Sequence, residues 1–265
     1  MRNRIVIIGA LTIDEIMDGV SYVLRPGGAP IYSGLGVTKA GGIAGGYVSI
    51  GEDFNFDLPD YISIIEKVIF KKTMRFLLEF KEGTRKLTLK HGHGPIPIVE
   101  QKLKGWNGVI LNPVCGEIPP SIDVSPLPVA VDIQGFVRNC VEGEEIVINR
   151  KFNYRVSSDL SIFHANTDEI TASGVTVDEL KDYGFNEIII SNGYNGFTLY
   201  TKEDGKTVYT PSVRGGNEVG NGDFLLASYF TLRLNGEDTI TAARNSLKLA
   251  ESFSILGQNV LTRSG

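Results

Sequence analysis

The stretch GNGDFLLASYFTLRL, residues 220–234, joins a glycine-rich turn to an apolar periodic run that is typical of a helix. Gly220 and Gly222 flank a single residue, so the backbone can turn tightly and expose successive N–H groups. A helix that begins there adds the positive end of its dipole, and the two features together form an anion site. Phosphate is the commonest occupant of such a site. The stretch therefore predicts a phosphate-binding turn at the start of a helix.

Asp223 lies inside this predicted anion site, and the site attracts the same charge that repels its carboxylate. One chemical reason for an aspartate there is proton abstraction from a hydroxyl that attacks a phosphoryl group, with a metal ion offsetting the repulsion. Asp is also favoured at helix N-caps and in first turns, so capping is the alternative interpretation. The local pattern leaves both open.

Composition limits the class of protein. The 265 residues are 42% hydrophobic and 22% charged, which predicts one globular domain over residues 1–265. The net charge of -5 argues against a nucleic-acid partner or an anionic membrane surface. The two cysteines, Cys115 and Cys140, have no metal-type spacing and predict a reducing, cytoplasmic location without a disulfide. No run of 18 apolar residues occurs, so neither a membrane span nor a signal peptide is expected.

Short apolar runs alternate with helical patterns along the chain. Apolar runs of this kind, without clean alternation, are typical of strands covered on both faces, and their alternation with helices predicts a mainly parallel, doubly wound α/β sheet. Ligands of such sheets collect at the carboxyl ends of the strands. The expected strands are 5–9, 108–111, 129–132, 161–164 and 187–190, and the expected helices are 31–40, 61–68, 176–183, 223–234 and 239–256.

Two regions predict hairpins. Residues 73–80 and 85–90 alternate polar and apolar side chains around a turn at 81–84, and residues 11–24 can supply further extended chain beside them. We expect parts of 11–25 and 71–92 to form a small antiparallel sheet that acts as a lid over a substrate site. A second hairpin is predicted from residues 196–200 and 206–211.

Five pieces of the chain, in order, resemble motifs of the ribokinase-like (PfkB-type) carbohydrate kinase family. The resemblance spans nearly the whole chain and implies a three-layer α/β/α fold. The pieces are Thr12-Ile13-Asp14, Pro26-Gly27-Gly28-Ala29-Pro30, Asn166-Thr167-Asp168-Glu169, Ser191-Asn192-Gly193 with Gly196, and Gly220-Asn221-Gly222-Asp223.

The resemblance implies a role for each piece. Asp223 is expected to be the catalytic base, and the backbone N–H groups of Gly220, Asn221 and Gly222 to form the anion hole. The expected substrate-binding residues are Asp14, Gly27, Gly28 and Tyr32, and the expected nucleotide-binding residues are Ser191, Gly193 and Gly196. Asn166 and Glu169 are expected to hold Mg²⁺ through water, with ATP as the phosphate donor.

Ordinary structural roles remain open for several of these residues. Asn166 followed three positions later by Glu169 is close to the capping-box pattern, and both roles can hold at once. Asp14 can instead start a turn, and the glycines at 27 and 28 can form an ordinary turn. The residues after the strand at 187–190 can likewise form a turn.

The chain departs from the family pattern at three places. Tyr32 stands where the family carries asparagine, which shapes the acceptor pocket differently. Asn217-Glu218 replaces Asp-Thr in a stretch that helps bind a monovalent cation, so potassium activation is not expected. Asn221 replaces alanine between the two glycines.

The leading hypothesis is ATP-dependent phosphorylation of a hydroxyl on a small polyol: a sugar, a nucleoside or an inositol-like acceptor. The alternative is a non-catalytic nucleotide or sugar sensor on the same fold. A dinucleotide-dependent oxidoreductase ranks low, because the first strand is followed by Gly9 alone rather than GxGxxG. The expected partners are the acceptor and the nucleotide, with a homodimer formed through the lid as a further expectation.

Overall fold

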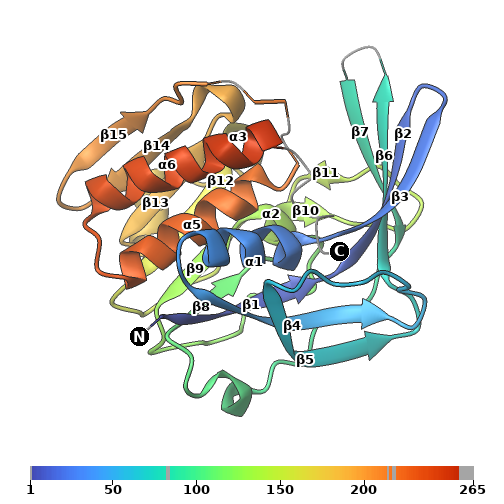
Figure 1. Cartoon of the computed structure of the whole chain (residues 1–265), viewed down its shortest axis with the longest axis horizontal. Coiled ribbons are helices and arrows are strands. Elements are labelled where there is room, and N and C mark those ends of the chain that lie inside the picture. Colours follow the sequence, from blue (N-terminus) through green and yellow to red (C-terminus); the bar gives the residue numbers. More distant parts are fainter. Residues whose placement is uncertain (1, 82–83, 214, 217–218, 257–265) are drawn as a thin grey trace.

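A nine-stranded sheet forms the centre of the molecule in the computed structural model, which describes residues 2–81, 84–213, 215–216 and 219–256 (Figure 1). The strand order is β15-β14-β13-β12-β9-β8-β1-β4-β5. All neighbours from β13 to β5 run parallel, whereas β14 and β15 are added antiparallel at one edge. The strands are β1 (Arg4–Ala10), β4 (Ile43–Gly51), β5 (Ile62–Phe70), β8 (Gly108–Leu111), β9 (Val129–Asp132), β12 (Ser161–Asn166), β13 (Glu187–Ser191), β14 (Phe197–Thr201) and β15 (Gly205–Tyr209).

Successive residues of the central strands face opposite cores, as a period of two requires. Ile5 and Ile7 of β1 lie in the core under α1, α5 and α6, whereas Val6 and Ile8 lie in the core on the other face. All four side chains are fully buried. Burial on both faces explains why these strands read as apolar runs without alternation.

Helices cover both faces, giving the expected three-layer α/β/α arrangement (Figure 1). α1, α5 and α6 pack together on one face, and side chains of α3 and α4 contribute to the core on the other. The helices are α1 (Ala29–Lys39), α2 (Gln134–Val137), α3 (Thr167–Ser173), α4 (Val177–Asp182), α5 (Asn221–Leu234) and α6 (Thr239–Leu256), with 3₁₀ turns at Glu100–Leu103 and Gly193–Asn195.

A four-stranded sheet stands beside the carboxyl end of β1, in the order β3-β2-β6-β7 (Figure 1). It contains the predicted hairpin, β6–β7, and residues 11–24 supply extended chain beside it as expected, although the central pair β2–β6 is parallel. A hairpin made of β2 and β3 is inserted between β1 and α1, with only Leu11 before it and only Gly28 after it. The strands are β2 (Thr12–Asp18), β3 (Ser21–Gly27), β6 (Met74–Lys81) and β7 (Thr84–His91); β10 (Arg138–Asn139) and β11 (Val147–Ile148) form a separate pair.

One predicted helix is wrong. Residues 61–68 belong to strand β5, which pairs in parallel with β4 at the edge of the central sheet. The sequence of β5, ISIIEKVIF, is rich in β-branched residues, and its side chains alternate in exposure along much of the strand. These residues fit a pleated surface better than a helix. The other predicted helices and the second hairpin, β14–β15, are confirmed.

The cysteine prediction is also wrong. Cys115 and Cys140 form a disulfide, with their Cα atoms 5.9 Å apart. This separation lies in the usual range for a disulfide. The two residues are 25 positions apart in sequence and belong to different loops, so spacing alone did not indicate the pair.

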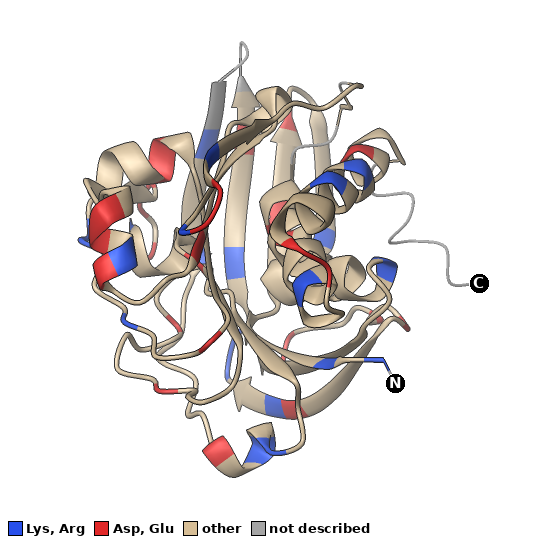
Figure 2. Ribbon diagram, turned by 90° about the vertical axis from the view of Figure 1, so that its left-hand side faces the viewer, with Lys and Arg blue, Asp and Glu red and all other residues tan. Residues whose placement is uncertain are grey.

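Figure 2 shows Lys and Arg interspersed with Asp and Glu along the ribbon, in keeping with the net charge of -5. Within the described ranges, none of the helices combines the length and the apolar character needed to cross a bilayer.

Candidate active site

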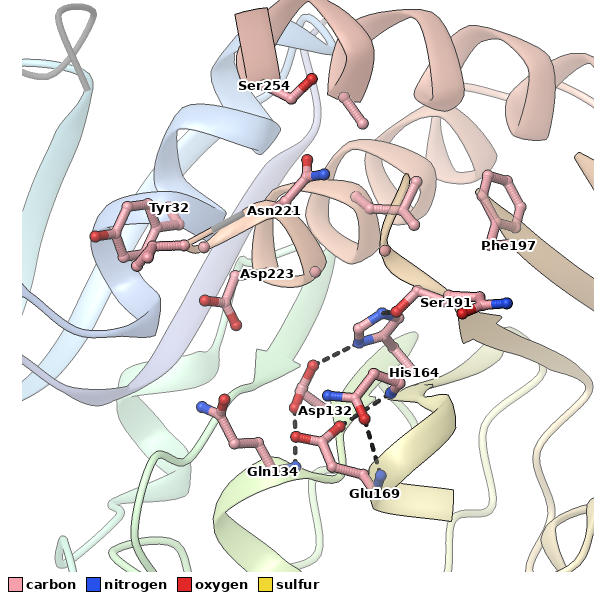
Figure 3. A pocket seen from close by; sticks show the side chains of 18 of the residues that line it. Tyr32, Asp132, Gln134, His164, Glu169, Ser191, Phe197, Asn221, Asp223 and Ser254 are labelled. Atoms are coloured by element: carbon pink, nitrogen blue, oxygen red, sulfur yellow. Dashed lines mark hydrogen bonds and ion pairs between the residues drawn. The ribbon is translucent and has the colours of Figure 1, made fainter. Parts of the chain in front are cut away.

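A cavity of about 740 Å³ lies at the carboxyl ends of the central strands, between the start of α5 and the four-stranded sheet. It brings together twelve of the thirteen predicted site residues, from segments far apart in sequence (Figure 3). These are Asp14, Gly28, Tyr32, Asn166, Glu169, Ser191, Gly193, Gly196, Gly220, Asn221, Gly222 and Asp223. Gly27 lies just outside the lining.

The glycines of the turn before α5 are required by their surroundings. Gly220 is the N-cap residue of α5 and has a φ of 76°, in the left-handed region that favours glycine. A Cβ atom there would lie 2.2 Å from Cγ of Tyr32, and a Cβ atom at Gly222 would lie 2.7 Å from Cε1 of His164. The turn therefore packs directly on these two rings, with no room for larger residues.

Asp223 is the third residue of α5, beyond the N-cap position, and its carboxylate faces the cavity (Figure 3). Asn112 Nδ2 donates a hydrogen bond to its Oδ1 at 3.0 Å. Burial, followed by the negative charge of Asp132, raises the pKa of Asp223 to about 7. A pKa near neutrality lets a carboxylate accept a proton and release it again.

Two residues that sequence reasoning did not single out form a hydrogen-bonded chain beside Asp223. Asp132 ends β9, and its Oδ2 lies 2.6 Å from Nδ1 of His164. Nε2 of His164 lies 3.1 Å from Oγ of the predicted nucleotide-binding residue Ser191. Burial lowers the pKa of His164, but the hydrogen bond to Asp132 and its charge outweigh burial and raise the pKa overall. Their position in the sequence is the one feature that could indicate them, because each is a polar residue at or near the carboxyl end of a buried strand.

Asn166 and Glu169 form the capping box that their spacing allows. Asn166 Oδ1 accepts from the backbone N–H of Glu169 at 2.8 Å, and Glu169 Oε2 accepts from the backbone N–H of Asn166 at 3.0 Å. Burial and the charge of Asp132 raise the pKa of Glu169, which marks a place where a cation would be favoured. In the described chain no three His, Cys, Asp or Glu residues gather closely enough to hold a metal ion directly. A carboxylate and an amide side by side are the kind of groups that can hold Mg²⁺ through its water shell, because this ion keeps most of its waters.

The end of the cavity next to the four-stranded sheet combines polar and apolar groups. Asp14, on β2, accepts a hydrogen bond from Oγ1 of Thr12 at 2.8 Å. A Cβ atom at Gly27 would lie 2.2 Å from Oδ2 of Asp14, so this glycine leaves space for the carboxylate. Gly28 has a φ of 99° and passes close to the carbonyl of Ala10. Further lining residues that the motifs did not indicate are Phe76, Leu78, Leu87, Gln134 and Arg138.

The opposite end of the cavity begins at Ser191 and the turn after β13. Gly193 and Gly196 both have positive φ angles, of 50° and 87°, and the turn closes with the backbone N–H of Asn192 donating to the carbonyl of Gly196. Side chains from three further segments complete this end: Phe197, Pro211, Val213, Leu247, Ala250 and Ser254.

Two of the departures from the family pattern can be placed. The Tyr32 ring packs beneath Gly220 and meets Phe253 edge-on, with ring centroids 6.4 Å apart. The side-chain amide of Asn221 faces the active-site cavity. Asn217 and Glu218 lie outside the described residues.

Solved structures with the same architecture were found, although no protein-family profile and no curated protein matches the sequence. A sulfate complex of a pyrophosphate-dependent kinase in the ribokinase family superposes with a TM-score of 0.73 at 16% identity, over 93% of this chain and 94% of that chain. The chain has a ribokinase-like fold. A kinase of that family bound to a pyrophosphate analog and myo-inositol gives 0.72 at 16% identity, over 96% and 98% of the two chains.

A third structure with the ribokinase-like fold is the ribokinase of Arabidopsis thaliana complexed with ribose and ATP. Its TM-score is 0.70 at 15% identity, over 95% of this chain and 92% of that chain. The match covers nearly the full length of both proteins, and the predicted fold class is therefore confirmed.

Proposed function

We propose that this chain transfers a phosphoryl group to a hydroxyl of a small polyol, as a carbohydrate kinase. The observation that carries the proposal is Asp223: a carboxylate with a pKa of about 7, placed at the start of a helix whose glycine turn attracts anions. The neighbours of known structure support it, since they are kinases that share the ribokinase-like fold.

In the proposed reaction, Asp223 accepts the proton of the acceptor hydroxyl as its oxygen attacks the terminal phosphorus of the donor. The new O–P bond forms while the bond from that phosphorus to the leaving oxygen breaks, and the leaving phosphate keeps the electron pair. Backbone N–H groups of Gly220, Asn221 and Gly222, together with the dipole of α5, stabilise the charge on the transferring group.

The donor end of the cavity is proposed to hold ATP, at Ser191, Gly193 and Gly196. Mg²⁺, when bound through waters to Asn166 and Glu169, would neutralise charge on the donor phosphates. The neighbours include both an ATP complex and pyrophosphate-dependent kinases. A donor comparison between ATP and pyrophosphate therefore belongs in the first assay.

The acceptor end is proposed to orient the polyol through Asp14 and the backbone at Gly27 and Gly28, with Tyr32 shaping the pocket from beneath the glycine turn. A carboxylate can accept hydrogen bonds from two neighbouring hydroxyls, as sugars, nucleosides and inositols all present. Phe76 and Leu78 of β6 line the same end, which supports a covering role for the four-stranded sheet.

Two further parts of the proposal concern the protein's surroundings. Tyr22, Val23 and Leu24 are exposed on β3, an edge strand, which supports a homodimer formed through the four-stranded sheet. The use of a nucleotide as phosphate donor supports a cytoplasmic location for the protein. Because disulfides are rare in reducing compartments, thiol labelling of the protein in intact cells tests that location.

Screening donor consumption by wild type and Asp223→Asn against ribose, fructose phosphates, nucleosides and inositols tests the function. We expect turnover with one acceptor class, and a loss of about 10²- to 10⁴-fold in the variant because the positioned base is gone. Near-normal turnover in the variant would contradict the proposed function.

A non-catalytic sensor is the second candidate function, because Tyr32 differs from the family pattern in the acceptor pocket. Ligand binding without turnover on any acceptor would favour the sensor.

A further inference from the structure

The disulfide joins two segments that also meet in the active-site cavity. Cys115 follows Val114 in the loop after β8, and Cys140 lies two residues beyond Arg138. Arg138 Nη1 donates a hydrogen bond to the carbonyl of Val114 at 3.2 Å. A covalent link and a hydrogen bond from a charged donor to a backbone carbonyl therefore tie the same pair of segments together.

The segment that carries Cys115 is firmly anchored. The carboxylate of Glu117, which is fully buried, accepts hydrogen bonds from the backbone N–H groups of Ala10 at 3.0 Å, Val114 at 2.8 Å and Cys115 at 2.8 Å. Ala10 is the last residue of β1, so this loop is fixed to the central sheet. Three hydrogen bonds to one buried carboxylate make a strong, directional anchor.

The segment that carries Arg138 contains only short elements of regular structure. It consists of the four-residue helix α2 and the two-residue strand β10, whose partner β11 is equally short. The disulfide connects this segment to the anchored loop.

Arg138 is the one Lys or Arg among the described residues that line the cavity. Its Nη2 donates to Oε1 of Gln134 at 2.7 Å, at the end of the cavity proposed for the acceptor. Its charge also lowers the pKa of Asp223 and of Glu169, opposing the effect of burial. The position of this guanidinium therefore affects both the acceptor end of the cavity and the pKa of the carboxylates Asp223 and Glu169.

We infer that the Cys115–Cys140 disulfide is a positioning link that holds the Arg138 guanidinium at the acceptor end of the cavity. The inference rests on the proposed function for its kinetic readout. A dithiol reductant would remove the link by donating two electrons and two protons: the Sγ–Sγ bond breaks, two thiols form, and the dithiol closes to its own disulfide. Acceptor binding then becomes sensitive to the redox state of this pair.

The kinetic test compares the oxidised wild type with the wild type reduced by dithiothreitol and with Cys115→Ser/Cys140→Ser. We expect the acceptor KM to rise about tenfold when the link is lost, the cost of weakening one hydrogen bond from a charged donor, while the donor KM stays within about twofold. In an Arg138→Gln background, loss of the link should change the acceptor KM little further, because the group that it positions is gone.

A control separates positioning from general destabilisation. Tyr229→Phe removes a buried hydrogen bond of 2.6 Å to Glu187, away from the cavity lining, and should leave the acceptor KM unchanged. An unchanged acceptor KM in the reduced and double-serine proteins would overturn the inference. So would an equal rise in the Arg138→Gln background.

If the oxidised wild type phosphorylates no acceptor, the proposed function fails, and crystal structures decide the inference separately. Displacement of the guanidinium from the carbonyl of Val114 in Cys115→Ser/Cys140→Ser, with the Glu117 anchor intact, would support positioning. Retention of the 3.2 Å contact between Arg138 Nη1 and that carbonyl in both proteins would overturn it.

Discussion

Replacing Asp223 with asparagine should make the folded protein more stable at neutral pH while it lowers turnover by about 10²- to 10⁴-fold. Burial and the neighbouring charge of Asp132 disfavour the ionised form of Asp223 and raise its pKa from 3.8 to about 7. Asparagine has nearly the same shape, carries no charge, and can still accept the hydrogen bond from Asn112. The change therefore removes the penalty and keeps the contact.

The size and pH dependence of this effect follow from the two pKa values. A difference of about three units corresponds to about 4 kcal/mol at most, and solvent in the cavity that screens the carboxylate reduces this figure. The folded-state pKa is the higher one, so the contribution of Asp223 to wild-type stability is fully present below about pH 4 and is lost as the pH rises through about 7. The advantage of the variant should be near zero at low pH and greatest above pH 7.

Urea unfolding of both proteins from pH 4.5 to 8 measures this advantage. Asp178→Asn is a matched control, because Asp178 is exposed and its side chain pairs with Lys181 on the surface, at 3.2 Å. A surface pair of this kind should change stability by at most about 1 kcal/mol. The reasoning is refuted if Asp223→Asn is less stable than wild type at pH 8, or if its advantage does not change with pH.

Three further predictions concern the site. In a pH–rate profile, kcat/KM should fall as the pH drops through about 7, because protonated Asp223 cannot accept the hydroxyl proton. Gly220→Ala should abolish turnover in a kinetic assay, since its Cβ would lie 2.2 Å from the Tyr32 ring, whereas Gly205→Ala, with a similar φ of 66° and open space around it, should retain turnover. Glu169→Gln should raise the Mg²⁺ concentration for half-maximal activity while circular dichroism stays unchanged, because glutamine can still accept the capping hydrogen bond.

The parts of the site that could be predicted are those carried by local sequence. The glycine turn before α5 and the capping box at Asn166 can be read locally because the residues that form each of them lie within four positions. The strands could be predicted for a related reason, since burial on both faces leaves a continuous apolar run in the sequence. The helix predicted for residues 61–68 is wrong because short apolar runs fit a strand and a helix about equally well. Pairing with β4 makes this segment a strand.

The parts that could not be predicted depend on contacts between distant segments. Asp132 and His164 are 32 residues apart and meet only because β9 and β12 are neighbours in the sheet. The position of Tyr32 beneath the glycine turn joins two segments nearly 190 residues apart. The spacing of residues in the sequence does not predict such contacts. Polar residues at the ends of buried strands nevertheless indicate which positions can contribute to a site.

The hairpin formed by β2 and β3 has a consequence for how such a protein could diversify. Because single residues join it to β1 and to α1, the hairpin is a compact insert in the first strand-to-helix connection. Asp14 and Gly27 lie at its base, whereas its tip at Asp18–Ser21 is exposed to solvent. Its length and outer residues can therefore vary without disturbing the turn at Gly220, which belongs to the opposite end of the chain. Under the proposed function, acceptor choice and phosphoryl transfer would be carried by separable modules, and new acceptors could be selected while the transfer machinery is kept.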